Sequence, residues 1–83
     1  MDKNKIEKKI INILNKRKKI KKNTNLKTYY YLDNGHIDSI EIMNFVVELE
    51  KVFEIKLFNK DIISRKFRSI QGLISVIHEK SNK

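Results

Sequence analysis

The chain of 83 residues is long enough for one small domain and too short for a second hydrophobic core. It contains no cysteine, which excludes disulfides and thiolate zinc sites, so the packing of an apolar core must stabilise the fold. No apolar run approaches membrane-spanning length and the N-terminus lacks a signal-peptide core, so we expect a cytoplasmic protein without stable membrane insertion.

The formal net charge of +9 is unevenly distributed along the chain. Residues 1–28 hold eleven Lys or Arg against two acids, whereas residues 29–58 hold two against six. Residues 59–83 are basic again, with six against two. A net positive charge suggests an anionic partner such as nucleic acid. The abundance of Lys, Ile and Asn is also typical of a sequence that drifts toward AT-rich codons, which requires no such partner.

The first predicted element is a helix over residues 3–17. Residues of its core face recur at three-, four- and seven-residue spacing, and they are Ile6, Ile10, Ile13, Leu14 and Arg17. A long connection follows over residues 18–38, which we expect Leu26, Leu32 and some of the tyrosines 29–31 to pin to the core. The basic run KRKKIKK, residues 16–22, either binds nucleic acid or a membrane surface, or is a solvated helix end; the second interpretation is favoured.

The second predicted helix covers residues 39–53. Asp38 is a good N-cap and Glu41 stands three residues later, which indicates a capping box. At 100° per residue one face gathers the core side chains, namely Ile42, Phe45, Val46, Leu49 and Phe53. The opposite face is also apolar, and glutamates 41, 48, 50 and 54 border its side chains Ile40, Met43 and Val47. An exposed apolar strip with an acidic rim indicates a docking surface for a basic partner.

The remaining chain predicts a short helical turn within residues 61–67 and a last helix over residues 70–80. Ser69 is the expected cap of the last helix, and its apolar positions follow helical spacing. Gly72 weakens this helix without outweighing the pattern. The expected fold is therefore all-α, a small bundle of three main helices plus a short third helix, with a long loop between helices 1 and 2.

Ser39 has two possible roles at the start of the second helix. A catalytic serine needs an oriented base, and His36 and His78 are the only histidines, with no G-x-S-x-G motif present. Free N–H groups in the first turn of a helix favour an anion, so a phosphate ester on Ser39 would be tolerated there. The alternative is an ordinary helix-starting serine, and spacing alone favours it.

The segment LDNGHIDSIEIMNFVVELEKVFEIKL resembles the phosphopantetheine attachment segment of acyl and peptidyl carrier proteins. The residues that carry the resemblance are Gly35, Asp38, Ser39, Ile40, Glu41, Leu49, Glu50, Phe53 and Leu57. The segment DIISRKFRSIQGLISVI is similar to the later helices of the family, especially in stand-alone carriers of dedicated pathways such as D-alanyl carriers. The similarity covers about residues 26–77, and it implies a four-helix bundle of the acyl-carrier type.

The resemblance implies that the chain is a carrier rather than an enzyme. Ser39 would accept 4′-phosphopantetheine, donated by coenzyme A through a phosphopantetheinyl transferase, and would carry acyl or aminoacyl groups as thioesters. Asp38 would help to bind the transferase magnesium, with Gly35 and His36 beside the arm, and no metal site of its own is expected. His36 itself is expected on an exposed turn. The partner face would be Ile40, Glu41, Met43, Val47 and Glu48, and the cargo cleft Phe45, Val46, Ile62, Ile63 and Phe67.

The expected partners are the transferase, an adenylating ligase or acyltransferase, and downstream biosynthetic enzymes, all meeting a monomer. Typical fatty-acid carriers are acidic throughout and this chain is not, so a dedicated pathway is the favoured function. A general fatty-acid-synthesis carrier is the alternative. From other classes, a basic nucleic-acid-binding helical domain and a bundle used only for interactions remain open.

Overall fold

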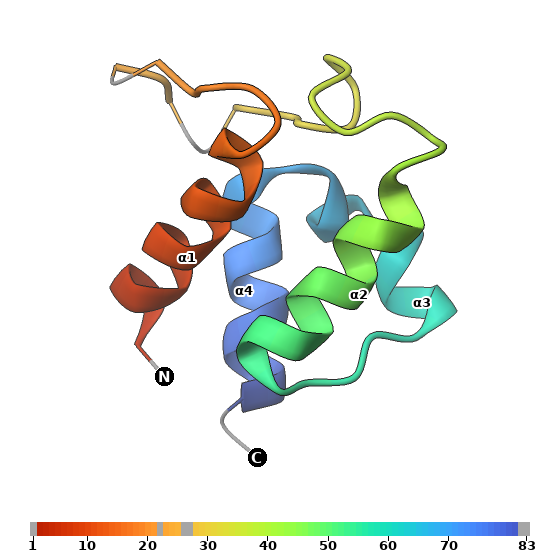
Figure 1. Ribbon diagram of the computed structural model, residues 1–83. Coiled ribbons are helices and arrows are strands. Elements are labelled where there is room, and N and C mark those ends of the chain that lie inside the picture. The colour runs from red at the N-terminus through yellow and green to blue at the C-terminus, as the bar shows by residue number, and fades with distance from the viewer. Residues whose placement is uncertain (1, 22, 26–27, 82–83) are drawn as a thin grey trace.

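The computed structural model describes residues 2–21, 23–25 and 28–81, and within these ranges every regular element is helical. The elements are α1 (Lys3–Asn15), α2 (Ile42–Phe53), α3 (Asn59–Ile62), the 3-10 turn η1 (Arg65–Arg68) and α4 (Ile70–Ser81). In Figure 1, α1 and α4 lie side by side, with the chain between α1 and α2 crossing one end of the bundle. Helix α1 begins and helix α4 ends at the opposite end. The predicted small all-α bundle is confirmed.

The interior is built from one apolar face of each long helix. Asp2 begins α1, because its carboxylate accepts the N–H of Lys5 at 3.1 Å. Helix α1 then buries Ile6, Ile10, Ile13 and Leu14, whereas α4 buries Ile70, Leu73, Ile74, Val76 and Ile77. Helix α2 contributes Phe45, Val46, Leu49 and Phe53. Burial of these faces removes apolar surface from water and is the main stabilising contribution in a chain of this size.

Helix α1 ends at Asn15, two residues before the predicted end at residue 17. The N–H groups of Arg17 and Lys18 both donate to the Leu14 carbonyl, at 3.0 and 3.1 Å, which closes a tight turn. The Asn15 side chain then accepts the N–H of Ile20 at 2.8 Å. Because the chain turns here, Arg17 leaves the helix and becomes free to contact other elements.

Tyr31 anchors the long connection between α1 and α2. Its ring is fully buried and packs edge-to-face on Phe45 and Phe67, with centroid separations of 5.4 and 6.4 Å. Its hydroxyl donates to the backbone carbonyl of Phe67, and burial raises the pKa of this hydroxyl, which keeps it protonated. Leu32 also packs against the core, as expected, whereas Leu26 lies outside the described residues.

The segment between α2 and α4 forms two short turns, where the sequence predicted one within residues 61–67. Glu54, in a left-handed conformation with φ of 54°, ends α2. The carboxylate of Glu50 accepts the N–H of Leu57 at 2.9 Å, which holds the following loop against α2. Asp61 then accepts the N–H of Phe58 at 2.9 Å at the start of α3, and η1 follows as a separate turn.

Gly72 has a packing role that the sequence did not indicate. A Cβ at this position would lie 2.1 Å from the backbone oxygen of Lys66 in η1. Only glycine leaves room for η1 to pack so closely on the first turn of α4. The residue that lowers the helix propensity of α4 is therefore the one that lets η1 dock on it.

Candidate functional site

Residues 38–41 form a turn that precedes α2. The Asp38 carboxylate accepts the N–H groups of Ile40 and Glu41 at 3.0 and 2.8 Å. Helix α2 begins at Ile42, three residues after the predicted start, because this side-chain-held turn occupies the intervening residues. The predicted capping box at the start of α2 is therefore wrong: the N-cap of α2 is Glu41, which makes no side-chain cap hydrogen bond, and Asp38 holds the preceding turn instead.

Ser39 is exposed on this turn. Its neighbour Asp38 accepts the available N–H groups, and the Ser39 hydroxyl makes no hydrogen bond to another described residue. The hydroxyl is therefore open to an incoming reagent, and an ester on it would extend into solvent without displacing a core side chain. These properties fit the attachment of a phosphodiester-linked group to this serine.

Gly35 and His36 lie in the loop a few residues before Ser39. Gly35 has φ of +79°, a conformation that other L-residues rarely adopt, and an added Cβ would meet nothing within 4 Å. The backbone conformation alone therefore explains this glycine.

His36 is buried, with only 6% of its surface exposed, so the expectation of an exposed turn residue was wrong. One ring nitrogen, Nε2, lies 2.8 Å from the Leu14 carbonyl, and Nδ1 lies 2.5 Å from the Tyr29 hydroxyl. A carbonyl only accepts, so Nε2 carries a proton and donates to Leu14. The imidazole joins the loop to the end of α1, and both of its nitrogens are already occupied.

The outer face of α2 carries an apolar strip, which we define as Ile40, Met43 and Val47. Their exposed fractions are 85%, 59% and 44%. Exposed apolar side chains that gather on one face are a candidate surface for another molecule to cover. The strip begins next to Ser39, so a protein seated on it would have the serine at its edge.

The two glutamates that flank the apolar strip are paired within the chain. Glu41 accepts Arg17 Nε at 3.0 Å, and Glu48 lies 3.5 Å from Arg17 Nη2. Lys16 Nζ reaches the other oxygen of Glu48 at 3.0 Å. The Arg17 guanidinium also donates to the Ile13 carbonyl at 3.2 Å and stands 5.8 Å from the centre of the Phe45 ring.

These ion pairs were missed at the sequence level. Glu41 and Glu48 are seven residues apart, which predicts that they share one helix face, but nothing local to Arg17 indicates that it turns toward them. Two cations of the basic run 16–22, Lys16 and Arg17, therefore form ion pairs with acids of the same chain.

The residues predicted to line a cargo cleft do not share one environment. Phe45, Val46 and Phe67 are buried in the core, and the rings of Phe45 and Phe67 are 6.4 Å apart in an edge-to-face contact. Ile62 is partly buried against this core, whereas Ile63 is 81% exposed. Aromatic side chains fill the interior at this place, so cargo could enter it only if these rings moved.

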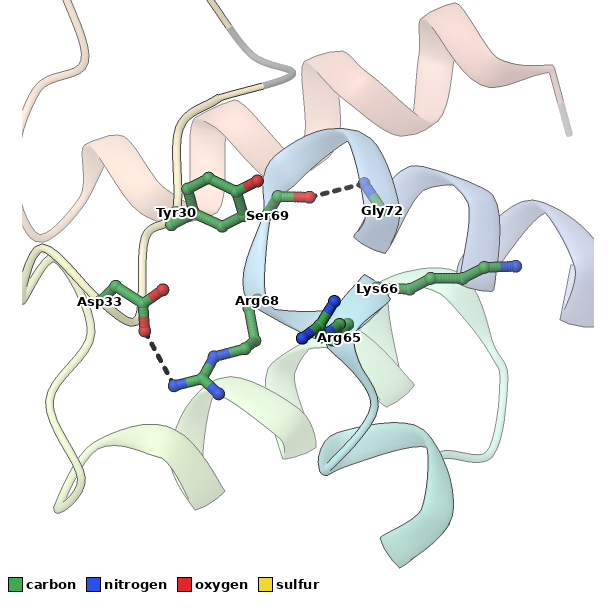
Figure 2. Close-up of a pocket in the computed structure, with 7 residues that line it drawn as sticks. All are labelled: Tyr30, Asp33, Arg65, Lys66, Arg68, Ser69 and Gly72. Carbon is green, nitrogen blue, oxygen red and sulfur yellow. Dashed lines mark hydrogen bonds and ion pairs between the residues drawn. The ribbon is translucent and has the colours of Figure 1, made fainter.

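A basic hollow lies between the loop and the first turn of α4 (Figure 2). Its cavity volume is about 520 Å³, and its lining residues are Tyr30, Asp33, Arg65, Lys66, Arg68, Ser69 and Gly72. Arg68 reaches Asp33 at 2.8 Å, and the Ser69 hydroxyl accepts the N–H of Gly72 at 3.0 Å. Three basic residues and one acid line the hollow, and only Arg68 is paired with that acid, so the hollow attracts anions more than cations.

The described residues contain no group of three or more His, Asp or Glu side chains placed to hold a metal ion. No helix in the described part of the chain is both long and apolar enough to cross a membrane.

Comparison with known proteins identifies the family. The chain is 31% identical over 80 residues to the acyl carrier protein of Buchnera aphidicola from Schizaphis graminum, covering 96% of this chain and 99% of the relative. No family model matches the chain, and no solved structure matches it significantly. The near-complete coverage, together with the helical bundle, shows that the chain belongs to the acyl carrier protein family. Its role is that of a carrier rather than of a catalyst.

Proposed function

We propose that this carrier holds acyl or aminoacyl groups on a 4′-phosphopantetheine arm attached to Ser39. The observation that supports this most directly is the exposed Ser39 hydroxyl, without a hydrogen bond to the described residues, at the edge of the apolar strip. A transferase seated on the strip would find the hydroxyl beside its own reacting group. Asp38 holds the turn that presents this hydroxyl, and its exposed carboxylate is available to a transferase-bound magnesium.

In the attachment reaction, the Ser39 oxygen forms a bond to the phosphorus that bears the pantetheine of coenzyme A. The pyrophosphate bond breaks, 3′,5′-ADP leaves, and the serine proton passes to a base on the transferase. When attached, the arm supplies a thiol on which cargo is carried. The absence of cysteine from the chain is consistent with this, because the arm brings its own thiol.

Intact-mass measurement tests the attachment. The protein is incubated with coenzyme A, magnesium and a broad-specificity phosphopantetheinyl transferase, and we expect a mass increase of one phosphopantetheine. Ser39→Ala should show no increase, whereas Ser75→Ala, a matched change of a half-buried serine on α4, should be modified like the wild type. An unmodified wild type, under conditions that fully convert a control carrier, would contradict the proposal.

We assign the carrier to a dedicated pathway, with a general fatty-acid-synthesis carrier as the alternative. The assignment is supported by the charge of the protein, which is +9 overall, and by the internal pairing of Glu41 and Glu48. The protein that carries the free phosphopantetheine arm should be a poor acceptor for the acyltransferase of general fatty-acid synthesis. Loading at the rate of a housekeeping carrier would favour the alternative.

A further inference from the structure

The charge around the apolar strip in the structure differs from the charge that the sequence pattern predicts. The sequence shows an apolar strip with acids beside it, which predicts a basic partner surface. In the structure, the carboxylates of Glu41 and Glu48 receive three contacts from Lys16 and Arg17, at 3.0 to 3.5 Å. These two glutamates and their two cations are therefore charge-balanced as a group, and the exposed carboxylate of Asp38 lies outside that group.

Arg17 is held in place by more than its two ion pairs. Its Nη1 donates to the Ile13 carbonyl, and its guanidinium stands over the face of the Phe45 ring. Its side chain is mostly buried, with 21% exposed, and that of Glu48 is 25% exposed. Ion pairs that are partly shielded from water in this way are weakly screened by salt and persist more than exposed pairs do.

A partner whose cations bind the acids on this face must therefore compete with Arg17 for the carboxylates of Glu41 and Glu48. A basic groove approaching α2 would meet carboxylates already paired and would also meet the positive charges of Lys16 and Arg17 themselves. The apolar strip, by contrast, remains uncovered. Charge contributes most to the rate and specificity of association, so neutralising the acids changes which partners dock and leaves the apolar contact intact.

We propose that Arg17, aided by Lys16, masks the acids of α2 and thereby selects partners that dock through an apolar recess rather than a basic groove. This inference rests on the proposed carrier function, because it concerns the enzymes that act on Ser39. The partner surface it describes has an apolar recess complementary to Ile40, Met43 and Val47, with few unpaired cations around it. Arg17 acts through Glu41 and Glu48 and is a positioning residue.

The test uses a phosphopantetheinyl transferase whose carrier-binding groove is basic, with KM for the full-length apo-protein measured between low and high salt. The wild type should show a high KM that changes little with salt. Arg17→Gln should lower KM at low salt by about 3- to 10-fold, and the gain should disappear at high salt. Lys8→Gln removes one positive charge from α1 without touching the glutamates and should behave like the wild type.

Further variants separate unmasking from a loss of folding. Arg17→Gln combined with Glu41→Gln and Glu48→Gln should return the salt dependence to that of the wild type, because neither position then carries a carboxylate for Arg17 to mask. If circular dichroism shows that Arg17→Gln does not fold, Lys16→Gln replaces it, with a smaller expected decrease in KM. The Lys16 side chain is 69% exposed and is not part of the core, so its replacement should not disturb folding.

The outcomes for this inference and for the carrier function are distinct. A wild type that is never modified contradicts the proposed function. A wild type that is modified, with Arg17→Gln and Lys16→Gln unchanged in both KM and salt dependence, overturns the masking role alone. A gain in Arg17→Gln that survives in the triple variant would also overturn it, since the glutamates would then not be its cause.

Discussion

The starts of α2 and α4 each carry a serine, and the two serines have opposite surroundings. Ser69 is 8% exposed, and its hydroxyl accepts the N–H of Gly72 as a helix cap. Ser39 is exposed in the turn before α2, and Asp38 one residue earlier accepts the N–H groups of Ile40 and Glu41. A serine near a helix start is therefore a structural residue when it caps and an available hydroxyl when its neighbour accepts the N–H groups instead. The α4 start depends on close packing, whereas the α2 start depends on surface contacts.

The largest expected loss of stability comes from a substitution in the first turn of α4, where η1 packs closely. Gly72→Ala places a methyl group against the Lys66 backbone oxygen, so η1 must move away from α4. We expect a loss of about 2 to 3 kcal/mol in the free energy of unfolding, after allowing for the better helix propensity of alanine. Urea denaturation followed by circular dichroism measures it. Gln71→Ala on the same helix is the control, and equal stability of the two variants would contradict the close approach.

The second prediction concerns the hydrogen bond that attaches the loop between α1 and α2 to η1. Tyr31→Phe keeps the ring contacts and removes the donor to the Phe67 carbonyl, which is left buried without its partner. The expected loss in the free energy of unfolding is about 2 kcal/mol. Tyr30→Phe, at an exposed neighbouring ring, should cost almost nothing. Similar losses in both variants would show that the hydroxyl of Tyr31 does not anchor the loop.

The third prediction compares the two serines directly. Ser69→Ala should lower the free energy of unfolding by about 1 kcal/mol, the usual contribution of a helix cap. Ser39→Ala should leave it unchanged, because its hydroxyl holds no described residue. Thermal melting of both variants beside the wild type measures the difference. If Ser39→Ala melted earlier than Ser69→Ala, the contrast between the two helix starts would be wrong.

The smallest effect concerns α3 (Asn59–Ile62), which lies between the two helix starts in the chain. Burial raises the pKa of the Asp61 carboxyl, but the Phe58 N–H and the Lys80 ammonium, 2.9 Å away, outweigh it and hold that pKa below its ordinary value. A carboxyl with a lowered folded-state pKa contributes stability above its unfolded pKa, near 3.8, and loses it as the pH falls through the folded value.

Asp61→Asn should therefore be less stable than the wild type at neutral pH, by up to about 1 kcal/mol, and the gap should close at an acidic pH below 3.8. Urea denaturation at the two pH values measures this. Glu79→Gln, at an exposed carboxylate one residue before Lys80, is the control and should show no such closing gap. A gap for Asp61→Asn that stays constant with pH would contradict the role of its charge.

The sequence predicted what depends on regular spacing. The buried faces of α1, α2 and α4 repeat at helical intervals, and the outward position of Ile40, Met43 and Val47 follows from the same geometry. Helix ends were less well placed. The turn held by Asp38 and the early end of α1 both depend on side chains that bond to the backbone, and these compete with helical hydrogen bonds.

The missed features are contacts between residues distant in sequence. His36 is buried because the end of α1 supplies a carbonyl 22 positions away, and Arg17 reaches glutamates 24 and 31 positions later. Gly72 is required by a turn whose position depends on Phe67 and Tyr31. A local pattern carries no information about such pairings, which only the folded chain brings together.

Helix α1 begins and helix α4 ends at the end of the bundle away from the loop that precedes α2 (Figure 1). A linker fused to either end would therefore extend away from Ser39 and from the apolar strip. Protein immobilised on a bead or sensor surface through such a linker would present this face outward, open to enzymes in solution. Either terminus is thus a suitable place for a purification tag.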